Sequence, residues 1–149
     1  MIIRELSPGE CRAVFAANRS ASLACSHDDR PYVVPIFYAH ADGCAYAFTM
    51  LGRKLETMRA NPNVALLVEH IGEGRTWTTV VAEGRFEELA DRIGHKRERD
   101  RAWSLLSTHA NWWEPGALKP AMPALADHSS HVFFRIHLDA ISGREAVHE

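Results

Sequence analysis

Early in the chain, three short strand-like segments follow one another with only tight polar turns between them, and this order constrains the fold most. Residues 21–26 alternate small and apolar side chains, and residues 32–38 are rich in β-branched and aromatic ones. Residues 44–50 form a third segment of this kind. The connections at 27–31 and 41–43 have the Asp, Pro and Gly content of turns. The spacing therefore predicts an antiparallel meander.

Proline and glycine mark where the predicted sheet is interrupted. Pro35 lies inside the second segment and cannot donate a ladder hydrogen bond, so it predicts an edge, a bulge or a split in the sheet. Gly84 lies inside a longer strand segment and predicts a bulge there. Four further strand segments are expected, at residues 63–69, 76–89, 132–138 and, as a second short piece, about 140–147.

Helix signals separate these strands. Ser7 and Glu10 form a capping box around Pro8, which stands at a favoured first helical position. After the meander the apolar spacing lengthens, so that Leu55 and Met58 fall on one helical face. The predicted helices cover residues 8–17, 51–59 and 90–110.

Together the elements predict one domain over residues 1–149, because this length suits a single domain. The expected class is mainly β, a β-barrel with peripheral helices. A doubly wound parallel sheet would need helices between most of the strands, and the sequence lacks them.

Charge and hydropathy exclude several classes of partner. The chain has 17 Lys and Arg against 19 Asp and Glu, so it has no cationic surplus for general nucleic-acid binding. Its longest wholly aliphatic run, 64–68, is far shorter than a membrane span of about 20 residues. The first residues do not resemble a signal peptide. We therefore expect a cytoplasmic protein that binds neither nucleic acid nor membranes.

One local anion site is predicted where the third strand segment leads into the second helix. Thr49 ends the strand, Gly52 follows, and Arg53 and Lys54 stand in the first helical turn. A helix start, a hydroxyl and two cations suit a phosphate monoester, whereas two cations there without an anion oppose the helix dipole. The alternative is that both side chains simply extend into solvent.

Motifs in a fixed order resemble the FMN-binding split-barrel superfamily of pyridoxamine 5′-phosphate oxidase, near its small nitroimidazole-resistance-type branch. The resemblance covers roughly residues 10–145. The motifs are Asp29-Arg30-Pro31-Tyr32-Val33-Val34-Pro35-Ile36, Gly52-Arg53-Lys54-Leu55, Arg59 to Val64, Val80-Val81-Ala82-Glu83-Gly84-Arg85 and Phe134-Arg135-Ile136.

This resemblance implies a six-stranded antiparallel split barrel that forms a homodimer and binds FMN at the subunit interface. It implies that the backbone of one strand follows the isoalloxazine ring, and that the end of the next strand holds the phosphate and ribityl chain. The implied ring contacts are Val33, Val34, Pro35 and Ile36, and the implied phosphate and ribityl contacts are Phe48, Thr49, Met50, Arg53 and Lys54.

Departures from the family patterns argue against the oxidase activity itself. The resemblance places Thr79 where the oxidase usually has a Gln that reaches the flavin. The resemblance does not include the longer C-terminal segment of the oxidase. Arg135 and His137 faintly resemble an Arg-x-His motif of the oxidase substrate site. They share one face of an apolar strand, however, which favours a structural role. Phe48 replaces a His common in the nitroimidazole-resistance branch.

Two features of the region 109–131 have alternative interpretations. Trp113, beside a second Trp, either covers the flavin or a planar substrate, packs against a partner chain, or anchors a long loop. His128 and His131 are spaced for a metal pair, but no suitably placed third ligand accompanies them, so no metal site is predicted.

The leading hypothesis is an FMN-dependent oxidoreductase that acts on a small molecule through flavin N5, and no catalytic residue is assigned. The alternative is a non-catalytic binding or sensor protein on the same scaffold, holding flavin, haem or a deazaflavin. A dimer without a cofactor is the third possibility.

Overall fold

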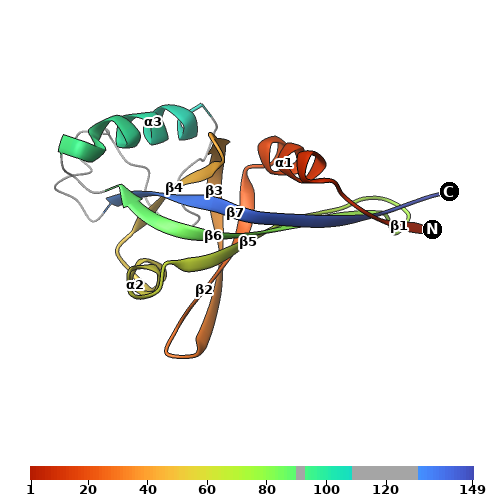
Figure 1. Cartoon of the computed structure of the whole chain (residues 1–149), viewed down its shortest axis with the longest axis horizontal. Coiled ribbons are helices and arrows are strands. Elements are labelled where there is room, and N and C mark those ends of the chain that lie inside the picture. The colour runs from red at the N-terminus through yellow and green to blue at the C-terminus, as the bar shows by residue number, and fades with distance from the viewer. Residues whose placement is uncertain (90–92, 109–130) are drawn as a thin grey trace.

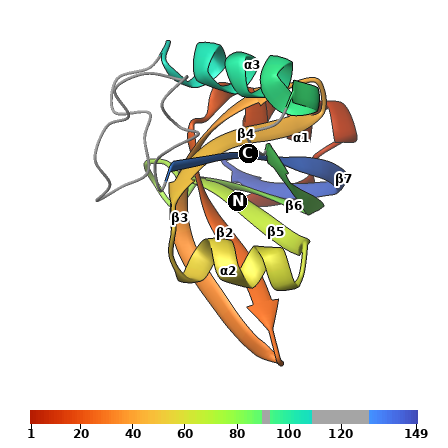
Figure 2. The same cartoon turned by 90° about the vertical axis from the view of Figure 1, so that its left-hand side faces the viewer.

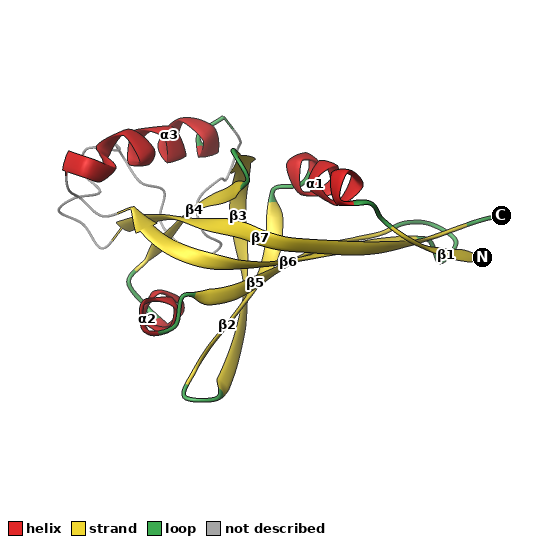
Figure 3. Cartoon of the chain, in the orientation of Figure 1, coloured by secondary structure: helices red, strands yellow, loops and turns green. Residues whose placement is uncertain are grey.

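The computed structural model describes residues 1–89, 93–108 and 131–149. Its strands are β1 (Ile2–Glu5), β2 (Ser20–His27), β3 (Arg30–Ala41), β4 (Cys44–Met50), β5 (Asn63–Ile71), β6 (Trp77–Leu89) and β7 (His131–Val147). Its helices are α1 (Pro8–Ala17), α2 (Arg53–Ala60) and α3 (Lys96–Leu106), the last preceded by the 3₁₀ turn η1 (Ile93–His95). Figures 1 and 3 show their arrangement.

Six of the strands form a closed ring. Hydrogen-bonded neighbours run in the order β7, β4, β3, β2, β5 and β6, and pairing of β6 with β7 closes the ring. All pairs are antiparallel, and β1 adds to β7 outside the ring. The predicted meander is confirmed, with two-residue turns at Asp28–Asp29 and Asp42–Gly43 whose φ angles are all positive, as hairpin turns require. The expected mainly β class is thus confirmed.

The interruption predicted at Pro35 is a split between two halves of β3. Residues 30–37 of β3 pair with β2, while only residues 38–41 pair with β4. The first half of β3 therefore has one free edge among the described residues. Tyr38 donates its N–H to the carbonyl of Arg19 on the β2 side. Because backbone directions alternate, Pro31 and Pro35 fall at edge-facing positions, where a missing donor breaks no ladder.

Two apolar cores lie on opposite sides of the strands. The larger fills the ring and includes Phe15, Leu23 and Phe134. The smaller lies beneath α3 and includes Phe48 and Phe133. Figure 2 shows α3 and α2 on opposite sides of the ring. No helix in the described ranges has the length and apolar character needed to cross a membrane.

The last strand differs from its prediction, because β7 is one continuous strand rather than two pieces. The 13-residue β6 pairs along nearly all of it. Opposite Glu83 and Gly84 the register shifts so that Asp139 of β7 is left unpaired in a bulge. A Cβ on Gly84 would overlap the carbonyl oxygen of His137, so the bulge predicted at Gly84 is confirmed.

Other differences concern short or terminal elements. The strand β1 was not predicted because four residues carry little periodicity, and its partner lies at the far end of the chain. The expected second helix begins two residues later than predicted, at Arg53. The expected helix over 90–110 is resolved as η1 and α3, with 90–92 and 109–130 outside the described residues.

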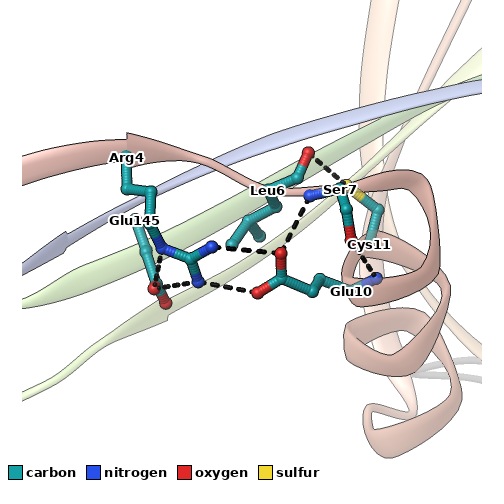
Figure 4. Close-up of polar contacts among 6 residues, drawn as sticks. All are labelled: Arg4, Leu6, Ser7, Glu10, Cys11 and Glu145. Carbon is teal, nitrogen blue, oxygen red and sulfur yellow. Dashed lines mark hydrogen bonds and ion pairs between the residues drawn. The ribbon is translucent and has the colours of Figure 1, made fainter.

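The predicted capping box of α1 is present and connects to β7. Ser7 Oγ accepts from the backbone N–H of Glu10, and the Glu10 carboxylate accepts from the Ser7 N–H. Arg4 binds both Glu10 oxygens at 2.6 and 3.0 Å and Glu145 at 2.6 Å (Figure 4). This arginine therefore ties the start of α1 to the first and last strands of the chain.

Candidate functional site

The turn from β4 into α2 brings a buried lysine and a buried threonine together. Lys54 Nζ donates to Thr49 Oγ1 over 3.4 Å, and the two side chains are only 5% and 1% exposed. The Thr49 hydroxyl in turn donates to the carbonyl of Met50 at 3.1 Å. Leu55 and Met58, both fully buried, fix the orientation of α2. The predicted proximity of Thr49 and Lys54 is therefore present.

The neighbouring arginine turns toward a different part of the molecule. The guanidinium carbon of Arg53 lies 4.3 Å from the ring centroid of Tyr32 on β3. This cation–π contact links α2 to the first half of β3, next to its free edge. The two adjacent cations thus stand on either side of the helix start, one against a hydroxyl and one against an aromatic ring.

The free edge of β3 exposes only part of the predicted ring-binding segment. By backbone alternation, Val33 directs both its N–H and C=O outward, while Pro35 directs a C=O alone. Val33 is 62% exposed. Val34 and Ile36 direct their backbone groups to β2, and the Ile36 side chain is buried in the ring core. Among the four predicted positions, Val33 and Pro35 are therefore the ones that can meet a ligand with their backbones.

The remaining predicted residues at the end of β4 face the core beneath α3. Phe48 is 2% exposed, with its ring 5.5 Å from that of Phe133. Met50 is half-buried against the same core. The Phe48 side chain therefore packs in the core, and only the Phe48 backbone remains available for the predicted ribityl contact.

Within one chain, Thr79 lies apart from the other predicted site residues. It pairs with Glu69 and Arg144 near the start of β6, and it lines a separate pocket with Leu6 and Gly143. Figure 1 shows the start of β6 toward the chain termini, whereas α2 lies toward the other end of the molecule. Trp113, the last predicted contact, lies outside the described residues, as does His128.

A pocket that the sequence did not predict borders Arg53. It has a volume of about 540 Å³ and lies between the β2–β3 hairpin and α2. The lining residues are His27, Asp28, Arg30, Tyr32, Arg53 and Thr57. Arg30 and Tyr32 belong to a motif noted above, but nothing local in the sequence indicates that they face α2.

A second polar group, also missed, lies on the outer face of β6 and β7. Glu87 Oε1 accepts from Arg135 Nε at 2.6 Å and lies 2.9 Å from His137 Nε2. Burial opposes ionisation of Glu87, but the hydrogen bonds from Arg135 and His137 outweigh it and lower its pKa. The Cys44 sulfur lies 3.5 Å from His137 Nδ1, and burial raises the pKa of this thiol.

This group has the character of a structural ion-pair network rather than of a reactive thiol, because reactive cysteines have a lowered pKa. It confirms that Arg135 and His137 share one face of β7. Among the described side chains no cluster of three potential metal ligands exists.

Comparison with known proteins identifies close relatives. A FAD-binding protein from Mesorhizobium loti is 53% identical, with a TM-score of 0.83 over 99% of this chain and 100% of that chain. A Rhizobium meliloti protein described as uncharacterised is 45% identical over 146 residues, covering 98% of this chain and 97% of the relative.

A distant structure shares the fold. A proposed 5-nitroimidazole antibiotic resistance protein from Bacteroides thetaiotaomicron is 13% identical, with a TM-score of 0.70 over 97% of this chain and 89% of that chain. The barrel described above is therefore the split barrel that the motifs predicted. The family model described as pyridoxamine 5′-phosphate oxidase matches residues 7–145. The chain therefore belongs to the pyridoxamine 5′-phosphate oxidase family.

Proposed function

We propose that this protein binds a flavin and holds the ribityl phosphate at the start of α2. The observation that carries the proposal is the buried Lys54–Thr49 contact beside Arg53. A phosphate monoester there would receive charge-assisted hydrogen bonds from Lys54 and Arg53, and one from the Thr49 hydroxyl once it rotates away from the Met50 carbonyl. The helix start adds backbone N–H groups that favour an anion.

The free edge of β3 suits the flavin ring. An isoalloxazine has an apolar benzenoid part and a polar edge of alternating hydrogen-bond donors and acceptors. Val33 offers an exposed apolar side chain and an outward N–H and C=O, and Pro35 adds a carbonyl. Thr49, Arg53 and Lys54 together are called the phosphate cluster. Tyr32, next to Val33 on β3, contacts Arg53 of this cluster, so one elongated ligand can meet both the strand edge and the cluster.

We propose that a second copy of the chain completes each site, forming a homodimer. Thr79 lies near the start of β6, in a pocket apart from Lys54 and Thr49 of its own chain, and on this proposal it contributes to the flavin site of a partner. Large apolar side chains that are exposed in the single chain support the pairing, since a second copy could cover them. They are Val33 at 62%, Leu51 at 60%, Ile71 at 77% and Val81 at 40% exposure.

For the identity of the flavin, we propose FAD as the resident cofactor, with FMN able to bind the same phosphate cluster. The sequence motifs led us to expect FMN. The 53% identical Mesorhizobium loti relative is described as FAD-binding, which supports the larger flavin. FAD contains the whole of FMN, so the roles proposed for Thr49, Arg53 and Lys54 are the same for both.

We propose an oxidoreductase activity on a small molecule, because a bound flavin supplies hydride or electron transfer at N5. The residues of this chain would hold the phosphate, orient the ring along β3 and exclude water where the partner chain covers it. None of the described site residues is assigned as an acid or base. Binding of the flavin without turnover is the competing outcome of the test below.

The experiment identifies the flavin and then asks whether it turns over. Denaturing the purified protein should release FAD into the supernatant at about one molecule per chain, and sedimentation should give the mass of a dimer. Anaerobic NADH or NADPH should then bleach the flavin absorbance, and an added electron acceptor should restore it. A protein that neither contains nor takes up FAD or FMN would contradict the proposal, and a flavin that no reductant bleaches would contradict the oxidoreductase part alone.

A further inference from the structure

We infer that the pocket between the β2–β3 hairpin and α2 holds the adenylate half of FAD, the part that FMN lacks. The inference rests on the proposed flavin site, and it assigns a role to residues that site does not use. The pocket volume of about 540 Å³ lies within the range of small-ligand sites, roughly 300–1,000 Å³.

Position is the first argument. Arg53 lines the pocket, and Lys54, the next residue, belongs to the phosphate cluster. A ligand that continues past a phosphate held at the start of α2 therefore reaches this pocket directly. Arg53 stands between the two compartments, where its planar fork of N–H donors can bind oxygens of both phosphates of a pyrophosphate.

Charge is the second argument. Two guanidinium groups, Arg30 and Arg53, line the pocket, and no carboxylate is hydrogen bonded to either among the described residues. Several arginines elsewhere are ion-paired with carboxylates: Arg4, Arg59, Arg85, Arg101 and Arg135. A pocket lined by two such cations suits an anionic ligand, and a pyrophosphate is one.

The hairpin geometry is the third argument. Asp28 and Asp29 form a two-residue turn with φ angles of 52° and 60°, which places His27 and Arg30 directly opposite each other. Opposed residues of an antiparallel pair share a face, and Tyr32, two residues beyond Arg30, lies on it too. The turn thus directs an imidazole, a guanidinium and a phenol ring toward α2.

The rim of the pocket carries one acid. The Asp28 carboxylate lies 3.2 Å from His27 Nε2 and is largely exposed. A carboxylate at this position can accept hydrogen bonds from ribose hydroxyls, the role that acidic residues play in other adenosine sites. The planar groups of His27 and Arg53 offer stacking surfaces for the adenine ring.

The test compares FAD with FMN on one exposed residue. Arg30→Gln removes a pocket cation, lies outside the phosphate cluster and is exposed, so the fold should survive. We expect FAD to bind about tenfold or more weakly than to the wild type, as for loss of a charge-assisted hydrogen bond. FMN affinity should stay within about twofold, because FMN does not reach Arg30. Arg12→Gln, an exposed arginine on α1, is the matched control and should change neither affinity.

Each outcome decides the inference. Selective loss of FAD affinity in Arg30→Gln supports it. An equal loss of FAD and FMN affinity, or no change in either, overturns the inference and leaves the phosphate cluster intact. Failure of the wild type to bind either flavin overturns this inference together with the proposed function.

Discussion

The Lys54 ammonium lies 3.4 Å from the Thr49 hydroxyl, and both side chains are almost completely buried where β4 turns into α2. The two residues are five positions apart, and the fully buried Leu55 packs α2 against the core beside them. A charged group so placed is costly unless it serves as a hydrogen-bond donor. The phosphate of the flavin is proposed to bind at this contact, where the ammonium and the hydroxyl lie together.

Removing the ammonium should weaken flavin binding. Lys54→Met keeps the apolar stem but loses the donor, and we expect the affinity for FMN and for FAD to fall by about 10- to 150-fold, equivalent to roughly 1.5–3 kcal/mol. Fluorescence titration of the apo-protein measures both affinities. Lys96→Met, on the exposed side of α3, is the matched control. Unchanged flavin affinity in Lys54→Met would remove Lys54 from the site.

A buried tyrosine hydrogen bond should stabilise the packing of α1 on the ring. Tyr38 Oη donates to the carbonyl of Phe15 at 2.6 Å, and burial raises the pKa of the phenol, so it remains a donor at ordinary pH. Tyr38→Phe removes the shorter of two hydrogen bonds to this carbonyl, which still accepts from the Asn18 N–H at 3.3 Å, and should lower the free energy of unfolding by about 1 kcal/mol. Urea denaturation measures the change.

The comparison variant is Tyr46→Phe. In the wild type the Tyr46 hydroxyl accepts a hydrogen bond from Arg135 at 3.4 Å. Because Arg135 keeps its bond to Glu87, this loss should be smaller. A larger effect in Tyr46→Phe than in Tyr38→Phe would contradict this ranking.

Acid should weaken the junction of β1, α1 and β7. Hydrogen bonds from Arg4 and from the Ser7 backbone lower the pKa of Glu10 from 4.5 to about 2. A depressed pKa in the folded state means that the stabilisation is fully present above about pH 4.5 and is lost as the pH falls toward 2. Thermal unfolding of the wild type and of Glu10→Gln should therefore converge on acidification through this window.

The control is Glu5→Gln, which removes a nearby carboxylate that is outside the Arg4 network. The difference in melting temperature between Glu5→Gln and the wild type should not shrink on acidification as the difference for Glu10→Gln does. A constant gap between the wild type and Glu10→Gln down to about pH 2 would show that the network adds nothing through this carboxylate.

The bulge between β6 and β7 should tolerate only glycine at position 84. A Cβ there would overlap the carbonyl oxygen of His137, which belongs to backbone and cannot move aside. We expect Gly84→Ala to lose about 1–3 kcal/mol of stability in urea denaturation. Gly9→Ala, in open space on the first turn of α1, should be neutral or slightly stabilising. Equal stability of Gly84→Ala and the wild type would mean that the bulge relaxes freely.

Features encoded over a few residues could be predicted from the sequence. The capping box at Ser7 and Glu10, and the paired turns of the meander, depend on neighbours within about four residues. The contact between Thr49 and Lys54 could be predicted for the same reason, since only five positions separate the two residues. The resemblance to the family added the six-stranded antiparallel split barrel.

Features that join distant segments were missed. The pairing of β1 with β7 links residues 139 to 145 positions apart, and a four-residue strand has too little periodicity to be predicted. Glu87 meets Arg135 across 48 positions. Arg30 meets the pocket at Arg53 only because the β2–β3 hairpin folds back toward α2. No local sequence pattern predicts such contacts, because they form only when distant segments come together in the folded ring.

The most direct test of the account is a titration of the apo-protein with riboflavin, FMN and FAD in parallel. Riboflavin has the ring and ribityl chain but no phosphate, so the series isolates the role of Arg53 and Lys54. We predict one site per chain, with FMN and FAD bound more tightly than riboflavin by on the order of 100-fold, as two charge-assisted hydrogen bonds would give. Equal affinity for riboflavin and FMN, or binding of none of the three, would contradict the central claim that a phosphate is held at the start of α2.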